Sequence, residues 1–124
     1  MRKMLGTLTT MALFVGLIAP AFAADEEITL RGELIDTSCY TKQGFEKGTG
    51  AAHVTCAKDC AKKGQPLGIL TDGDGVFKIT GEYTENNNAK LLDYVGKKVE
   101  VKGAKDRYLD YSTAIKVTKI TVVK

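Results

Sequence analysis

The side chains best suited to chemistry are gathered in one segment, Cys39–Cys60. It contains all three cysteines of the chain, Cys39, Cys56 and Cys60, together with the only histidine, His53. Thiolates and imidazoles bind zinc and copper(I), and thiols also exchange disulfides. This segment is therefore the candidate functional site, and the rest of the chain is expected to hold it in place.

A metal ion is the first use of these residues that the sequence suggests. Three thiolates and one imidazole form a complete tetrahedral set for zinc, and the same soft set suits copper(I). On a regular helix His53, Cys56 and Cys60 lie within about 60° of one another. However, His53 and Cys60 are roughly 10 Å apart along the axis, which nearly exhausts the reach of both side chains. A single-metal site therefore works best with His53 in an irregular first turn and with Cys39 closing the site from a preceding loop.

Two further residues are candidates for the surroundings of such a metal. Asp36 and Tyr40 flank Cys39 in the sequence. A carboxylate or a phenol at this place can orient the histidine or shield the thiolates.

A disulfide is the alternative use of the cysteines. Cys56 and Cys60 pair poorly, because side chains one turn apart on a helix run parallel and miss the required dihedral angle. Cys39 paired with either of them would close a loop and contribute about 3 kcal/mol. The protein would then be a stapled binding module for a protein or small ligand, without metal. The odd number of cysteines favours a bound species, but both interpretations remain open.

Catalytic uses of the segment have weaker support. The Cys-x-x-Cys-His pattern of covalent haem is absent, and so is the Cys-x-x-Cys pattern of thioredoxin-like proteins. His53 could activate Cys56, but no residue pattern marks an oxyanion hole. Enzyme activity is therefore not favoured.

The N-terminus has the layout of a secretory signal peptide over residues 1–23. A basic start precedes an apolar run over Met11–Ala19, and Ala21–Ala23 gives an Ala-x-Ala cleavage pattern. The apolar run is shorter than the roughly 20 residues of a membrane span. We therefore expect cleavage after Ala23 and a periplasmic or secreted protein, with residues 24–124 forming one domain and no membrane span.

Composition disfavours a nucleic-acid partner. The chain has 18 basic and 15 acidic residues, and removal of the signal peptide would leave these charges almost balanced. The chain contains no tryptophan, and its other aromatic residues are scattered. Single-strand binders need a basic groove and aromatic stacking platforms. The expected partners are a metal ion and another exported protein.

Periodicity predicts a small, mainly β domain. Alternating apolar residues and turn signals indicate five strands, with a turn at 72–75 and a bulge near Thr118–Lys119. Glycine-rich residues 39–50 are expected to form a loop, and residues 51–63 a helix capped by Thr49 and ended by Gly64. The strands are expected at 26–36, 66–71, 76–80, 98–103 and 114–123, with a short helix at 89–95. This order predicts a five-stranded OB-like barrel with a Cys/His loop–helix insertion between strands 1 and 2.

Four segments carry a resemblance to a protein group. They are Gly-Glu-Leu-Ile-Asp-x-x-Cys-Tyr over 32–40, His-x-x-Cys-Ala-x-x-Cys over 53–60, Gly-x-Pro-x-Gly over 64–68 and Tyr-x-Gly-Lys-x-Val-x-Val-x-Gly over 94–103. Together they resemble a group of small exported bacterial proteins that are OB-like in outline and have no settled activity. The resemblance implies the fold and the cysteine–histidine site, and it leaves function open.

Overall fold

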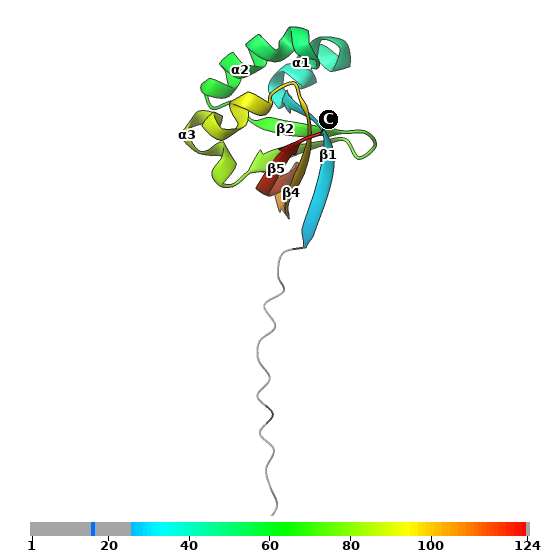
Figure 1. Cartoon of the computed structure of the whole chain (residues 1–124), viewed down its shortest axis with the longest axis vertical. Helices are drawn as coiled ribbons and strands as arrows, with labels where there is room; N and C mark the ends of the chain where they lie inside the picture. Colours follow the sequence, from blue (N-terminus) through cyan, green and yellow to red (C-terminus); the bar gives the residue numbers. More distant parts are fainter. Residues whose placement is uncertain (1–15, 17–25, 124) are drawn as a thin grey trace, which may run out of the picture.

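The computed structural model describes residue 16 and residues 26–123. The predicted cleavage site and nearly all of the predicted signal peptide lie outside these residues. A five-stranded sheet forms the body of the protein, and the helices gather at one end of it (Figure 1). In chain order the elements are β1 (Glu27–Asp36), α1 (Thr37–Gly48), η1 (Ala51–His53), α2 (Val54–Lys62), β2 (Leu67–Thr71), β3 (Val76–Thr80), η2 (Glu82–Thr84), α3 (Glu85–Asn88), η3 (Ala89–Tyr94), β4 (Lys98–Arg107) and β5 (Thr113–Val122).

The sheet closes on itself in the order β1-β2-β3-β5-β4. β1 closes the ring because it is long enough to pair with two strands: Glu27–Glu33 pairs with β4, and Gly32–Asp36 pairs with β2. β3 and β5 are parallel, and all other pairs are antiparallel. The prediction of a mainly β, five-stranded domain is confirmed.

The core fills the ring and extends under the helices. Strand residues with alternating burial supply most of it, as expected when one face of each strand turns inward. α2 adds two alanines and the segment around η3 adds two larger side chains. The buried residues of the core are Leu34, Ala57, Ala61, Leu67, Ile69, Ile79, Leu91, Val95, Val99, Val101, Ile115 and Val117.

The predicted bulge in the last strand is present. Lys102 pairs with Lys119, whereas the next residue, Gly103, pairs with Val117, which leaves Thr118 without a partner across the strands. The extra residue shifts the inward-facing positions of β5 from odd to even numbers, as the hydrophobic pattern requires.

Residues 39–50 are not the loop that their glycines suggested. They lie mostly in α1, which begins directly after β1. The Asp36 side chain caps this helix by accepting a hydrogen bond from the Cys39 backbone N–H at 2.9 Å. The helix breaks only at Gly44, whose φ of 77° is left-handed. A good capping residue therefore outweighed the poor helix propensity of the segment.

The second helix agrees in part with its prediction. It comprises the 3₁₀ turn η1 and the helix α2, and Gly64, with φ of 85°, ends it as expected. Thr49 does not cap it. Instead, the Thr49 hydroxyl donates to the Phe45 carbonyl oxygen in α1 at 2.6 Å.

Asn88 fastens the end of α2 to the segment between β3 and β4. Its side-chain Nδ2 donates to the carbonyl oxygens of Ala61 and Gln65 at 2.9 and 3.0 Å. The residue is 4% exposed and has a left-handed φ of 61°. The Ala61 carbonyl, which also accepts from the Gly64 N–H at 2.9 Å, and the Gln65 carbonyl just beyond the helix are thus held by one amide.

Replacing Asn88 with aspartate is expected to lower the free energy of unfolding by about 2–4 kcal/mol. The carboxylate keeps the shape of the amide but removes the donor and faces two carbonyl oxygens. Urea unfolding of the purified variant gives the measurement. The exposed Asn86 is also left-handed, so Asn86→Asp is the matched control and should change stability by less than about 0.5 kcal/mol. Equal effects of the two substitutions would contradict this assignment.

Candidate metal centre

The structure brings the three cysteines together. One sulfur atom from each of Cys39, Cys56 and Cys60 forms a group whose members all lie within 4.8 Å of one another. All three are free thiols, so none of the disulfides considered from the sequence is formed. This group of three sulfurs, called the cysteine cluster below, can hold a metal ion.

Cys39 reaches the cluster from the first turn of α1. The capping bond from its backbone N–H to Asp36 fixes the direction in which the helix leaves β1. Cys39 is 9% exposed, and Asp36 is fully buried. The Asp36 Oδ1 atom makes the capping bond, while its Oδ2 atom is buried without a hydrogen-bond partner. Burying a carboxylate oxygen without a hydrogen-bond partner costs free energy, which indicates that Asp36 has a role beyond filling space in the core.

Cys56 and Cys60 reach the cluster from α2, one helical turn apart. The core face of α2 is formed by Ala57 and Ala61, which are 1% and 0% exposed. Each cysteine precedes one of these alanines, so the two thiols lie about 100° around the helix from the core face. Because the alanines face the core, Cys56 and Cys60 project from the side of α2 rather than into the core. Cys56 is exposed, and Cys60 is intermediate in burial.

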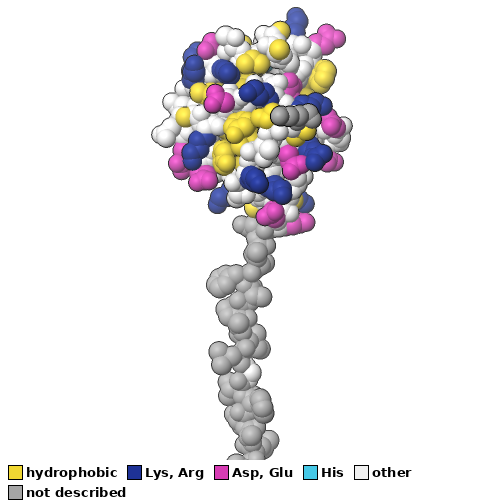
Figure 2. Space-filling view, in the orientation of Figure 1, with side chains coloured by type: hydrophobic (Ala, Val, Ile, Leu, Met, Phe, Trp, Pro, Cys, Tyr) yellow, Lys and Arg dark blue, Asp and Glu magenta, His cyan; other side chains and the backbone are white. Residues whose placement is uncertain are grey.

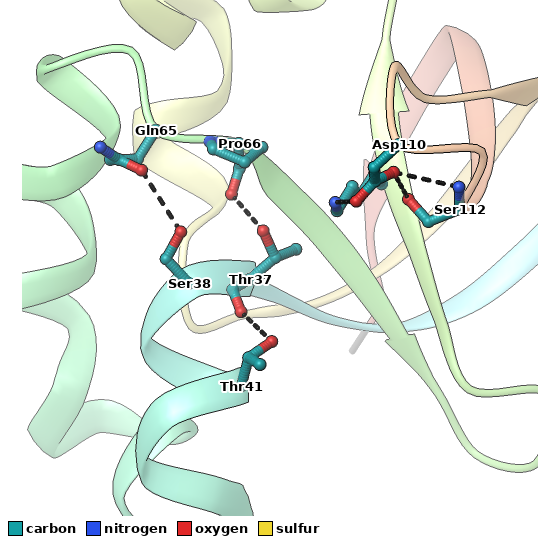
Figure 3. A network of polar contacts seen from close by, with 8 residues as sticks. Thr37, Ser38, Thr41, Gln65, Pro66, Asp110 and Ser112 are labelled. Atoms are coloured by element: carbon teal, nitrogen blue, oxygen red, sulfur yellow. Dashed lines mark hydrogen bonds and ion pairs between the residues drawn. The ribbon is translucent and has the colours of Figure 1, made fainter.

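Polar contacts fix α1 relative to the end of α2. The Thr37 hydroxyl donates to the Pro66 carbonyl oxygen at 2.8 Å, and the Ser38 hydroxyl bonds the Gln65 side chain at 3.3 Å (Figure 3). The Gln65 backbone N–H donates to the Cys60 carbonyl oxygen at 3.2 Å. One short network therefore links the residues before Cys39 to the helix turn that carries Cys60.

His53 lies outside the cysteine cluster. It does occupy an irregular first turn, the 3₁₀ turn η1, but it continues the buried row of Ala57 and Ala61 at a spacing of four residues. It is 9% exposed and faces a cavity of about 10 Å³ that Glu33, among others, lines. Its Nε2 atom has no hydrogen-bond partner. The four-residue set expected from the sequence is therefore a set of three in this structure.

Tyr40 follows Cys39 in α1 and is half-buried. A Cβ atom on Gly48 would come within 2.7 Å of the Tyr40 Cα atom, so the kinked end of α1 folds back closely on this residue. Tyr40 therefore helps to shape α1.

The environment of Cys39 favours its neutral thiol. The pKa of Cys39 is raised to about 12, first by burial and then, in decreasing order, by the nearby Asp36 carboxylate and the Cys60 and Cys56 thiols. A Cys39 thiolate would place its negative charge beside the Asp36 carboxylate and beside two thiols that can themselves ionise. A cation at the cluster reverses this preference, because it stabilises thiolates directly.

Alkylation of the metal-free, reduced protein should follow a fixed order. We expect iodoacetamide to modify Cys56 first, Cys60 more slowly and Cys39 last, because reaction needs both access and a thiolate. Peptide mapping after timed quenching measures the order. The raised pKa means that modification of Cys39 should continue to accelerate as the pH approaches 12. Modification of Cys39 ahead of Cys56 at neutral pH would contradict the arrangement.

Comparison with known proteins adds no relative. No protein family model matches the sequence, and no curated protein or solved structure matches it. Within residues 26–123, no helix combines the length and apolar character needed to cross a membrane. The function is therefore inferred from the geometry of the three cysteines.

Proposed function

We propose that this protein binds one zinc or copper(I) ion through Cys39, Cys56 and Cys60. The observation that carries the proposal is the group of three sulfurs within 4.8 Å of one another. Two sulfurs bound to one zinc ion at about 2.3 Å are roughly 3.8 Å apart in tetrahedral geometry. The thiols therefore need to move by only about 1 Å to share an ion, which side-chain rotation can supply.

The number of ligands bears on which ion is bound. Zinc in structural sites takes four ligands, so three cysteines leave one position for water, a partner or an added side chain. Copper(I) is a soft ion that three thiolates can satisfy. Because Cys56 is exposed, an ion at the cluster lies within reach of another molecule. This supports a metal-handling role as well as a structural one.

We further propose that the fold is an OB-like barrel and that the protein is exported. The strand order β1-β2-β3-β5-β4, the parallel pairing of β3 with β5, and the helical segment between β3 and β4 support the OB assignment. The signal-peptide pattern over residues 1–23 supports export to the periplasm or medium. Membership of the group of exported proteins that the sequence resembles is part of the same proposal.

The charges on the face seen in Figure 2 favour a metal or protein partner over nucleic acid. Figure 2 shows basic and acidic side chains interspersed on the visible face, without a continuous basic groove. Nucleic-acid binders gather positive charge on one face. The partner proposed beside the metal ion is another exported protein that delivers or receives the ion.

Metal titration followed by native mass spectrometry tests the proposal. The mature chain is reduced, freed of metal and titrated without oxygen, separately with zinc and with copper(I). We expect one ion per chain and protection of all three thiols from alkylation. Protein that stays metal-free with three reduced thiols would overturn the proposal, and so would binding that leaves Cys39 unprotected. The relative affinities, measured by chelator competition, decide between the two ions.

A further inference from the structure

We infer that the cysteine cluster also performs thiol–disulfide exchange when it holds no metal, with Cys56 as the attacking thiol and Cys39 as the resolving thiol. The substrate class is an accessible disulfide on a protein or small molecule. The inference uses the same three cysteines as the proposed metal site but does not require that a metal binds.

Access selects Cys56 as the attacking group. Exchange begins when a thiolate reaches a disulfide sulfur, so the attacking thiol must meet the other molecule. Of the three cysteines, Cys56 is the exposed one, Cys60 is intermediate and Cys39 is 9% exposed. An external disulfide therefore meets Cys56 before it can meet Cys39.

Geometry selects Cys39 as the resolving group. Cys56 and Cys60 lie one turn apart on α2, where parallel side chains oppose the dihedral angle of about 90° that a disulfide requires. Cys39 belongs to α1 and approaches from a separate element. Its sulfur already lies within 4.8 Å of both others, and a bond needs about 2 Å. Both favourable disulfides of this cluster therefore include Cys39.

The reaction balances without a further cofactor. The Cys56 sulfur loses its proton to solvent, bonds to one sulfur of the external disulfide and expels the other as a thiolate. The Cys39 thiol then loses its proton to solvent, and its sulfur bonds to Cys56 Sγ, breaks the mixed disulfide and expels the second thiolate. Because the surroundings of Cys39 favour its neutral thiol, this second step is expected to be the slower one, and the short distance between the sulfurs offsets the small thiolate fraction. Two protons move from the protein thiols through solvent to the two departing thiolates. The protein loses two electrons, the external disulfide gains them, and Cys60 remains a thiol that can exchange with the new bond.

This exchange and metal binding exclude each other. A disulfide between Cys39 and either partner removes two of the three thiolates from the cluster. Oxidation by a disulfide would therefore release the ion, and a bound ion would shield the thiols from oxidation.

Oxidised glutathione is the probe for the test. It is added without oxygen to the reduced, metal-free mature protein, and released glutathione thiol and protein mass are followed together. We expect two equivalents of released thiol, no glutathione left on the protein and a Cys39-containing disulfide in the peptide map. Protein that stops at a mixed disulfide would overturn the inference, and so would a map containing only the Cys56–Cys60 pair.

Two matched serine variants, one at Cys39 and one at Cys60, test which of these thiols resolves the mixed disulfide. Cys39→Ser should lose the second equivalent and accumulate the mixed disulfide on Cys56, whereas Cys60→Ser should still release both. The reverse pattern would overturn the assignment of Cys39. Circular dichroism and thermal unfolding check that both variants fold, and the wild-type peptide map decides the matter if one does not. Exchange without metal binding would reject the proposed function alone, and metal binding without exchange would reject this inference alone.

Discussion

Replacing Cys39 with serine is expected to abolish stoichiometric metal binding. The substitution removes one of three sulfurs and leaves only the pair Cys56 and Cys60 on α2. Loss of an outer-shell partner typically weakens metal affinity by about 10–100-fold, so loss of a direct ligand should weaken it by more. Chelator competition with zinc and with copper(I) measures the change. Serine is nearly the same size as cysteine, so the first turn of α1 should remain in place.

His53→Gln is the decisive comparison for this prediction. His53 lies outside the cysteine cluster, and glutamine keeps a polar side chain of similar length at the buried site. We expect the variant to bind one ion per chain with an affinity within about threefold of wild type, a smaller change than the roughly 10–100-fold loss typical of an outer-shell partner. A loss as large as that of Cys39→Ser would show that His53 swings into the site when the metal binds. The four-ligand set expected from the sequence would then be correct.

The second large effect is predicted for Gly32 in the middle of β1. A Cβ atom here would overlap the Leu70 carbonyl oxygen and lie 2.6 Å from its carbon. Gly32 also pairs with both neighbouring strands, Thr71 in β2 and Val99 in β4, so the backbone cannot shift without disturbing the closure of the sheet. Gly32→Ala should therefore lower the free energy of unfolding by about 3–5 kcal/mol, measured by urea denaturation.

Gly73→Ala is the matched control for the same chemical change. Gly73 lies in the turn between β2 and β3, and nothing lies within 4 Å of the place that a Cβ would occupy. Its φ is not left-handed, so alanine is expected to change stability by less than about 1 kcal/mol in either direction. If Gly32→Ala were as mild as this control, the close approach of β1 and β2 would be wrong.

The strands followed from the sequence because each carries its own local signal. Alternating apolar residues marked β1 and β4, and Asp72–Gly75 marked the turn between β2 and β3. Even the bulge at Thr118 could be predicted, since the inward-facing residues of β5 change from odd to even positions. These features depend on residues that are close in sequence.

Helix α1 could not be predicted in the same way. Its glycines and polar residues have low helix propensity, and the interactions that hold it come from outside the helix. Asp36 caps it from the end of β1, and Pro66 accepts a bond from Thr37. The sequence did contain the relevant signal, because aspartate is a common N-cap residue and Asp36 directly precedes the helix.

The position of His53 also depended on tertiary packing. Helical spacing alone placed it near Cys56 and Cys60, because angles around an axis do not say which face meets the core. The two alanines of α2 settle that question, since small side chains let the helix approach the sheet closely. His53 then shares the buried face with Ala57 and Ala61, whereas the sulfurs of Cys56 and Cys60 lie beside that of Cys39 in α1.

The insertion that carries the cysteines begins and ends at neighbouring points of the sheet. Asp36, the last residue of β1, pairs with Leu67, the first residue of β2, and the Thr37 N–H bonds the Pro66 carbonyl oxygen. In topology, residues 37–66 thus replace a hairpin turn, and the ring could close without them. In packing they are not dispensable, because Ala57 and Ala61 belong to the core. A graft of this segment into another barrel would therefore have to carry its alanine face as well as its thiols.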